Sequence, residues 1–143
     1  MKLSIRGLAF IRQWEGCKLE AYQDGGGVWT IGVGRTKGVK PGDTCSQAEA
    51  DEWLLEDAED HNIDPYLGDV PTRQNEYDAM TSLAFNIGLE RFRNSTVLKR
   101  HKLGNRVGAG NAFLLWKFDN GKMIPGLLRR REAERRLYLG PDA

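Results

Sequence analysis

Three consecutive glycines, Gly25-Gly26-Gly27, constrain the fold of this chain more than any other feature. They disfavour a helix at this point and allow a turn with positive φ angles. Short runs that suit β-strands flank them, Leu19–Tyr22 on one side and Val28–Val33 on the other. The intervening Gln23-Asp24 completes a typical turn sequence. The sequence therefore predicts a β-hairpin over this segment.

Apolar residues on either side of the hairpin recur at the three-to-four-residue spacing of amphipathic helices. A first helix is predicted to begin after Ser4 and to end at Gly16. A second is predicted to begin at Ser46, because Ser46 and Glu49 form the Ser-x-x-Glu pattern of a capping box. Its apolar positions continue to about residue 61.

The second half of the chain is predicted to be helical after an interruption at Asn62–Pro71, which contains two prolines and a glycine. Thr72 is expected to cap a helix that ends at Gly88. A turn is expected at Asp119-Asn120-Gly121. Further helices are predicted at 90–93, 96–103 and 108–118, and from Pro125 to Leu139.

The predicted fold class is α+β. A small N-terminal β-hairpin lobe is expected at about residues 17–45 and a predominantly helical C-terminal lobe at about 72–143, with the boundary near 46–72. The 143 residues are enough for one domain with a hydrophobic core, so both lobes are taken as parts of a single catalytic domain, 1–143.

The composition is that of an ordinary globular protein, with 40% hydrophobic and 29% charged residues. No apolar run approaches the roughly 18 residues of a membrane-spanning helix, so no stable membrane association is expected. The stretch from Met1 to Trp14 contains Arg6 and Arg12, which makes it a poor signal peptide. The chain is therefore expected to stay in the cytoplasm until another component releases it.

The net charge of +1 conceals a segregation along the sequence. Residues 1–40 carry seven basic and three acidic side chains, 41–72 carry ten acids and no base, and 73–143 carry fourteen bases and seven acids. Such asymmetry can hold lobes together or orient a protein on a charged polymer, although solvated helix faces of opposite sign are the commoner explanation. No nucleic-acid-binding motif accompanies the basic segment, so no nucleic-acid partner is predicted.

The cysteines and histidines show no metal-ligand spacing, and no metal or other cofactor is predicted. Cys17 and Cys45 allow at most one disulfide. Reduced, partly buried thiols are the favoured alternative for a cytoplasmic chain.

Glu15, Asp24 and Thr30 are the candidate catalytic residues. The end of a helix and a hairpin that folds back over it can bring these side chains around one cleft. Cleavage of a glycosidic bond needs such a set, because one carboxylic acid protonates the leaving oxygen while a second polar group handles a water or the anomeric carbon. Structural roles are the alternative, since Asp24 suits a turn and Thr30 suits a strand.

The motifs around these residues resemble phage-type lysozymes, glycoside hydrolase family 24. That family has a Glu, then eight residues, an Asp, five residues and a Thr, which matches Glu15, Asp24 and Thr30. The N-terminal motifs are Trp14-Glu15-Gly16, Ala21-Tyr22-Gln23-Asp24-Gly25 and Trp29-Thr30-Ile31-Gly32-Val33-Gly34. Later ones are Phe85-Asn86-Ile87-Gly88, Phe92, Ser95-Thr96, Trp116, Gly126-Leu127, Arg129-Arg130-Arg131 and Glu134. Arg35 stands where some relatives carry a histidine, so no pH-dependent bridge is expected there.

The resemblance implies a lysozyme-like fold with the active-site cleft between the two lobes. It implies hydrolysis, with inversion, of the β-1,4 bond between N-acetylmuramic acid and N-acetylglucosamine in peptidoglycan. Glu15 would be the general acid, while Asp24 and Thr30 hold the water. Phe85, Asn86 and Ser95 would contact substrate, with core and helix-cap roles as the alternative, and Arg130 is expected near Glu15.

The resemblance also implies an endolysin, a lysis enzyme of a phage or prophage. It would remain in the host cytoplasm until a holin releases it and would then act at the cell wall in the periplasm, as a monomer. Two other functions compete with this one. A lytic transglycosylase needs only one acid and has no use for a water held by Asp24 and Thr30. A non-catalytic wall-binding module has no chemical reason to retain Glu15.

Overall fold

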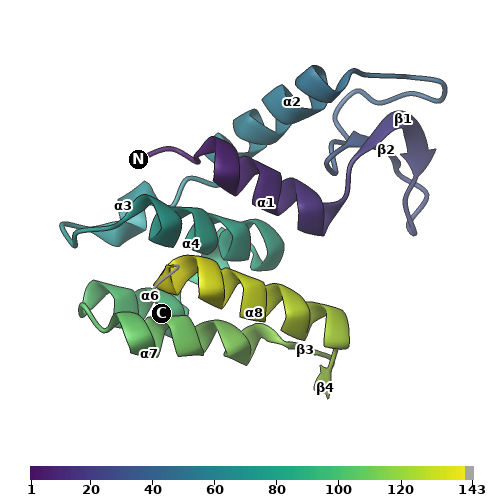
Figure 1. Ribbon diagram of the computed structural model, residues 1–143. Coiled ribbons are helices and arrows are strands. Elements are labelled where there is room, and N and C mark those ends of the chain that lie inside the picture. Colours follow the sequence, from purple (N-terminus) through teal and green to yellow (C-terminus); the bar gives the residue numbers. More distant parts are fainter. Residues whose placement is uncertain (141–143) are drawn as a thin grey trace. The chain divides into compact units, whose positions relative to one another are not determined.

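Helices make up most of this protein, and its strands occur only as two short antiparallel hairpins (Figure 1). The structure, a computed structural model, describes residues 1–140, so the last three residues of the predicted helical lobe lie outside the described part. The chain divides into two units. We call Leu8–Asp60 the hairpin unit, and Met1–Gly7 together with the chain from His61 onward the helical unit.

Strands β1 (Lys18–Gln23) and β2 (Trp29–Gly32) form the predicted hairpin. Their antiparallel register pairs Lys18 with Gly32, Tyr22 with Thr30 and Gln23 with Trp29, and it shifts between the first two pairs. Such an irregularity bends a strand, and β1 is curved (Figure 1). Helix α2 (Gln47–Asp60) packs on β2. The buried apolar residues of this unit are Leu8, Ile11, Ile31, Val33, Ala50, Leu54 and Ala58.

The predicted helix signals of this part of the chain are confirmed by their hydrogen bonds. Helix α1 (Ile5–Glu15) begins after Ser4, whose Oγ accepts a hydrogen bond from the N–H of Gly7 at 3.0 Å. It ends at Gly16, which has a φ of +76°. The capping box of α2 forms in both directions: Glu49 N–H donates to Ser46 Oγ at 3.1 Å, and Ser46 N–H donates to Glu49 Oε1 at 3.1 Å.

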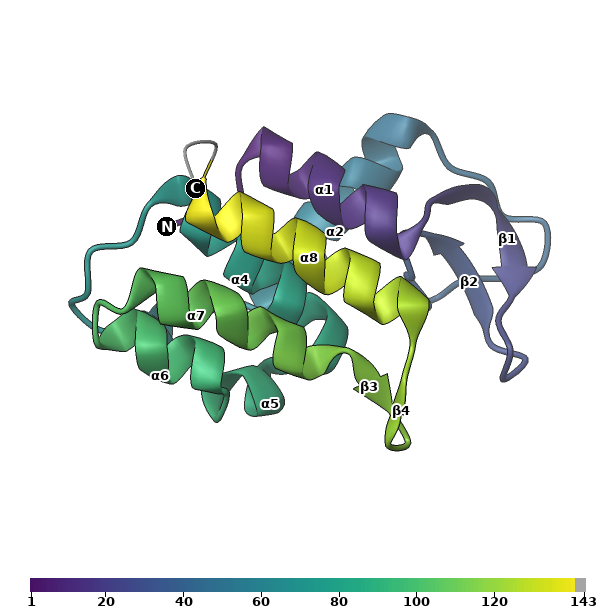
Figure 2. The ribbon, with the colours of Figure 1, turned by 60° about the horizontal axis from the view of Figure 1, so that its bottom comes forward.

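The helical unit is built around α4 (Gln74–Ile87), whose residues 76–84 are all buried. Helix α8 (Pro125–Leu139) lies along α4, and α7 (Arg106–Ala112) packs against α6 (Thr96–Lys102) and α8 (Figure 2). The remaining elements are α3 (Asp64–Leu67), α5 (Leu89–Arg93), the 3₁₀ helix η1 (Phe113–Trp116), β3 (Phe118–Asp119) and β4 (Lys122–Met123).

Three details of this unit differ from the prediction. Thr72 does not cap α4: its hydroxyl donates to Val70 O at 3.2 Å and lies 2.8 Å from His101 Nε2, and Arg73 occupies the cap position. The predicted helix at 108–118 ends earlier, as α7 followed by η1, and the turn after it closes the short β3–β4 hairpin. The predicted interruption contains a single helical turn, α3.

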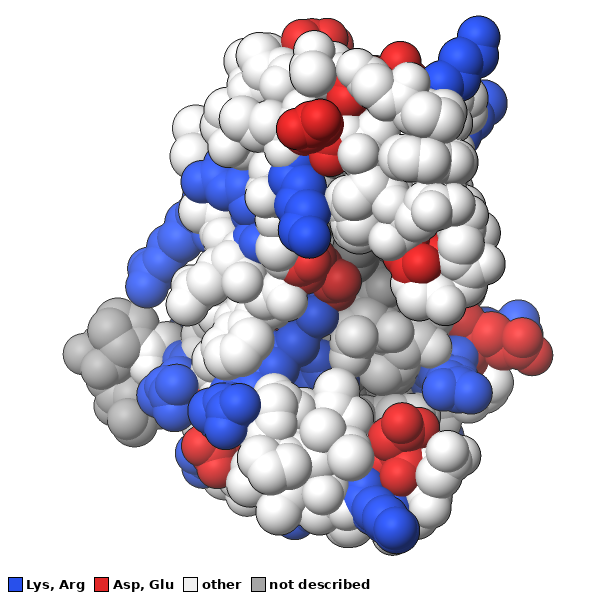
Figure 3. Space-filling view, turned by 90° about the vertical axis from the view of Figure 1, so that its right-hand side faces the viewer, with Lys and Arg blue, Asp and Glu red and all other residues white. Residues whose placement is uncertain are grey.

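Four polar side chains form a buried cluster between α4 and α8. Glu134 Oε1 lies 2.6 Å from Arg131 Nε, and Glu134 Oε2 accepts from Ser82 Oγ at 2.5 Å and from Arg130 Nε at 3.3 Å. Burial raises the pKa of Glu134, while the charges of Arg131 and Arg130 oppose that shift. Two bases of the positive C-terminal segment are thus internal. One face of the molecule shows acidic and basic side chains among larger uncharged areas (Figure 3).

Within residues 1–140, no helix combines the length and the apolar character that crossing a membrane requires. A search of the same residues finds no group of three or more histidine, cysteine or carboxylate side chains that could hold a metal ion.

Candidate active site

Glu15 is the last residue of α1 and is exposed to solvent. The helix stops there because Gly16 adopts a left-handed conformation and its N–H donates to Arg12 O at 2.9 Å. A residue with a Cβ disfavours that conformation, so glycine defines where the carboxylate leaves the helix. Trp14, directly before Glu15, packs against Phe10 with ring centroids 6.4 Å apart.

Asp24 lies in the glycine-rich turn between β1 and β2, and its carboxylate organises that turn. Asp24 Oδ1 accepts hydrogen bonds from the N–H of Gly26 at 2.8 Å and from the N–H of Val28 at 2.9 Å. The main chain of Asp24 also bonds to Gly27 and to Val28. Both side-chain bonds end on Oδ1. The second oxygen, Oδ2, belongs to an exposed residue and makes no printed bond to protein within the described chain.

Thr30 lies on β2, opposite Tyr22, and only 4% of it is exposed. Its Oγ1 donates a hydrogen bond to Val28 O at 3.0 Å. The hydroxyl proton is therefore committed, and the lone pairs of Oγ1 remain to accept a hydrogen bond from another donor, such as a water.

One peptide unit links the two polar side chains of the hairpin. Val28 donates its N–H to Asp24 Oδ1 and accepts the Thr30 hydroxyl on its carbonyl oxygen. Asp24 and Thr30 are therefore oriented by the same backbone residue, which the sequence analysis did not identify. A side-chain motif contains no signal for a backbone contact. The Asx-type turn that follows Asp24 was the feature that could have indicated it.

Two ion pairs brace the hairpin unit. Arg12 of α1 makes a bidentate contact with Asp51 of α2, at 2.8 and 2.9 Å, and Gln47 donates to the same carboxylate at 2.9 Å. Arg35 lies 5.0 Å from the ring centroid of Trp53 and 3.2 Å from Glu56. Arg35 thus has contacts of its own on α2, and neither partner is a histidine.

The predicted substrate-binding residues belong to the helical unit. Phe85, in the last turn of α4, is half-buried and packs on His61 with ring centroids 5.6 Å apart. Asn86 follows it and is exposed. Ser95 is buried, and its hydroxyl caps α6 by accepting from Leu98 N–H at 3.1 Å. Ser95 thus has the cap role that the sequence analysis gave as its alternative, and the substrate contacts stay predictions.

Arg130 was predicted to lie near Glu15. In the helical unit it is buried and its guanidinium donates to Glu134, to Ser82 O at 3.1 Å and to Ser82 Oγ at 3.3 Å. Glu15 belongs to the hairpin unit, so their pairing stays a prediction.

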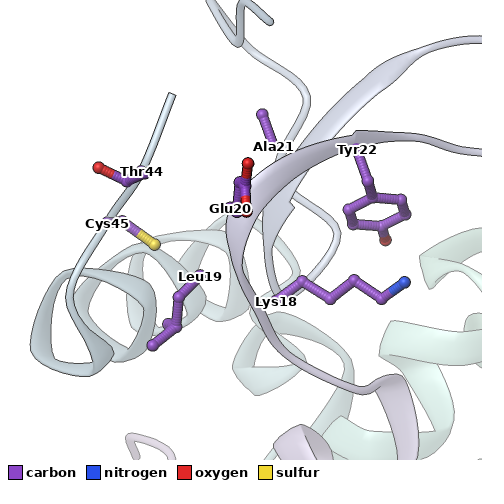
Figure 4. Close-up of a pocket in the computed structure, with 7 residues that line it drawn as sticks. All are labelled: Lys18, Leu19, Glu20, Ala21, Tyr22, Thr44 and Cys45. Carbon is purple, nitrogen blue, oxygen red and sulfur yellow. The ribbon is translucent and has the colours of Figure 1, made fainter. Parts of the chain in front are cut away.

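A shallow pocket of the hairpin unit lies elsewhere, along β1 and beside Cys45 (Figure 4). None of the three candidate catalytic residues lines it. Lys18 Nζ lies 4.4 Å from the ring centroid of Tyr22 there. Cys17 and Cys45 are both half-buried free thiols, and burial raises the pKa of Cys45 together with the nearby Cys17 and Glu49. The pocket residues are Lys18, Leu19, Glu20, Ala21, Tyr22, Thr44 and Cys45.

Together, the α+β architecture and the Glu, Asp and Thr on a helix end and a hairpin define a lysozyme-like protein. The sequence model of the phage lysozyme family matches residues 12–134. An endolysin of Acyrthosiphon pisum secondary endosymbiont phage 1 is 41% identical over 145 residues, covering 96% of this chain and 98% of that protein. The chain therefore belongs to the phage lysozyme family.

Solved structures agree. A mutant of P22 lysozyme is similar with a TM-score of 0.88 and 44% identity, over 98% of this chain and 99% of that one. The muramidase domain of SpmX from Asticaccaulis excentricus has a TM-score of 0.86 and 34% identity, over 98% and 99% of the two chains. The predicted fold class and family are confirmed, and the chain is a lysozyme-type glycoside hydrolase. The transglycosylase and binding-module alternatives are not favoured.

Proposed function

We propose that this protein hydrolyses the β-1,4 bond between N-acetylmuramic acid and N-acetylglucosamine in peptidoglycan with inversion of configuration. Glu15 is the general acid, and Asp24 with Thr30 holds the attacking water. The observation that carries this assignment is the Val28 peptide unit, which orients the Asp24 carboxylate and the Thr30 hydroxyl from one backbone position.

Each group has one task in the reaction. The Glu15 carboxyl gives its proton to the glycosidic oxygen as the bond to the anomeric carbon breaks. A water accepted by Thr30 Oγ1 attacks that carbon from the opposite face of the sugar, and its proton passes to the Asp24 carboxylate. Thr30 suits this role because its own proton is donated to Val28 O, so the hydroxyl presents lone pairs to the water.

The substrate contacts that we propose are Phe85, Asn86 and Ser95, with Asn86 the one whose side chain is exposed. Endolysins act on the peptidoglycan of the cell wall. We further propose that the protein works as a monomer and that it reaches the wall from the host cytoplasm through a membrane lesion made by a holin.

The test is a digest of purified peptidoglycan by the wild-type protein, by Glu15→Gln and by the matched variant Glu52→Gln, with the fragments weighed by mass spectrometry. Glu52 is an exposed carboxylate on α2 of the same unit. We expect fragments with hydrated reducing muramic acid ends from the wild type and from Glu52→Gln. Glu15→Gln should lose activity by about 10²–10⁴-fold, the usual contribution of a general acid, while it unfolds at the same temperature.

Two results would contradict the proposal. Fragments lighter by one water would identify a transglycosylase, since the muramic 6-hydroxyl would then have replaced water as the nucleophile. Full activity in Glu15→Gln would remove Glu15 from the reaction.

A further inference from the structure

The β3–β4 hairpin of the helical unit exposes an apolar pair that the proposed chemistry does not use. Phe118 and Met123 lie directly opposite each other in the antiparallel register, so their side chains are on the same face. Phe118 is 52% exposed and Met123 46% exposed. Leu115 and Ile124, next to the two strands, are exposed as well. We call these four residues together with Lys117 the hairpin face.

The backbone holds this face in a defined shape. The two-residue loop Asn120-Gly121 has φ angles of 51° and 77°, and positive values at both positions are those of a tight hairpin turn. Ile124 N–H donates to Lys117 O at 2.9 Å, which extends the pairing beyond the two strands. The hairpin projects beyond the ends of α7 and α8 (Figure 2). A side-chain pair fixed in this way loses little conformational freedom when a ligand binds.

Positive charge lies directly beside the apolar pair. The ammonium of Lys117 is 5.5 Å from the centroid of the Phe118 ring. Lys122 pairs with Asp119 across the strands, so these opposite charges lie on the other side of the hairpin. A ligand on the hairpin face thus meets an aromatic ring, a thioether and an ammonium group within one short stretch.

We propose that the hairpin face binds the peptide stem of peptidoglycan. This inference rests on the proposed function, because it assigns a second part of the same substrate. A stem alternates small apolar groups, such as alanine methyls and the methylenes of a diamino acid, with free carboxylates. The carboxylates are complementary to Lys117, and the carbon atoms beside them fall on Phe118 and Met123.

A lipid bilayer fits this surface less well. The tip of the hairpin is Asp119-Asn120-Gly121-Lys122, and a membrane-inserted hairpin would have to bury these polar residues before its apolar pair reached the acyl chains. The four apolar residues lie on one side near the base of the hairpin, which favours a ligand that lies along the face.

The experiment uses two substrates, glycan strands with their stems and the same strands after an amidase has removed them. The variants are Phe118→Ala, Met123→Ala and Lys117→Gln. Leu103→Ala and Val107→Ala are matched controls, since these side chains are 81% and 64% exposed elsewhere in the helical unit. We expect each hairpin variant to lower kcat/KM about tenfold on stem-bearing strands, through KM, and to leave stripped strands and the controls unchanged.

A binding measurement makes the test independent of turnover. The free stem tripeptide L-alanyl-γ-D-glutamyl-meso-diaminopimelate is titrated into the wild type, Phe118→Ala and Leu103→Ala, and Phe118→Ala alone should lose affinity. Equal loss of activity on both substrates would mean that the hairpin face binds glycan. Unchanged activity and unchanged tripeptide affinity, or Phe118-dependent binding to anionic phospholipid vesicles instead, would overturn the inference. A wild type that binds tripeptide but cleaves neither substrate would refute the proposed function alone.

Discussion

In the hairpin unit, Glu15 and Asp24 lie at the surface, and Asp24 is held by backbone N–H groups. In the helical unit, Glu134 and Arg131 are completely buried and are held by each other, by Ser82 and by Arg130. Both units therefore rely on carboxylates, but one unit presents them to a ligand and the other encloses them. A carboxylate that keeps its hydration costs the fold little, whereas a buried one depends on every partner that replaces water.

This difference predicts that activity and stability respond to substitutions in different units. Removing a polar group from the hairpin turn should affect chemistry while the protein stays folded. Removing one from the buried cluster should affect folding while the molecules that remain folded keep their activity. The three predictions below test this separation.

The largest effect is expected at Glu134. Glu134→Gln leaves the guanidinium groups of Arg130 and Arg131 buried without a countercharge, and breaking a buried ion pair in this way costs about 3–5 kcal/mol. The free energy of unfolding, measured by denaturant titration, should fall by that amount. Activity per folded molecule should be unchanged under conditions where the variant is folded.

Glu132→Gln is the matched control for Glu134→Gln, since Glu132 lies on the same helix and is exposed. It should leave stability nearly unchanged. If both variants unfolded at the same denaturant concentration, the buried cluster would not contribute to stability in the way described.

A smaller effect, on activity alone, is expected at Asp24. Asp24→Asn keeps an acceptor oxygen for Gly26 and Val28 but removes the base that takes the proton of water. We expect the rate to fall about 10²-fold or more with little change in thermal stability. Asp43→Asn is the control, because the Asp43 carboxylate also accepts a backbone N–H in a turn, from Lys40 at 2.8 Å. A mild effect of Asp24→Asn would shift the water-handling role to Thr30.

Local signals in the sequence predicted the elements that position these groups. The capping box of Ser46 and Glu49, the stop at Gly16 and the helix from Pro125 to Leu139 all formed as predicted, because each depends on residues close in sequence. Thr72 was assigned wrongly because its hydroxyl is taken up by His101, 29 residues away. No local pattern reports such a partner.

The candidate site divides in the same way. Spacing alone was enough to select Glu15, Asp24 and Thr30, yet it contained nothing about the Val28 peptide unit that orients two of them. The arginine-rich last helix predicted positive charge, but not that Arg131 would be fully buried against Glu134. Long-range pairing of charges depends on which helices become neighbours, and helical periodicity does not encode that choice.

The smallest effect is expected from His101, a second buried polar group of the helical unit. His101 Nδ1 lies 2.6 Å from Tyr138 OH and Nε2 lies 2.8 Å from Thr72 Oγ1, whose proton is donated to Val70 O. This chain of bonds suits a neutral imidazole that donates through Nε2 and accepts from Tyr138. Burial lowers the pKa of His101, with Arg106 acting in the same direction and Glu76 opposing it.

The sign of the resulting pH dependence follows from proton binding. Because the folded pKa of His101 lies below the unfolded value, the unfolded chain binds more protons between the two. The stability from the neutral imidazole is complete above about pH 6.5 and is lost as pH falls toward the folded pKa, by at most about 1.4 kcal/mol per pH unit. Denaturant titrations from pH 8 to 5 should show a smaller decline in His101→Gln than in wild type or in the control His61→Gln. Equal declines in all three would show that the enclosed histidine does not make the helical unit sensitive to pH.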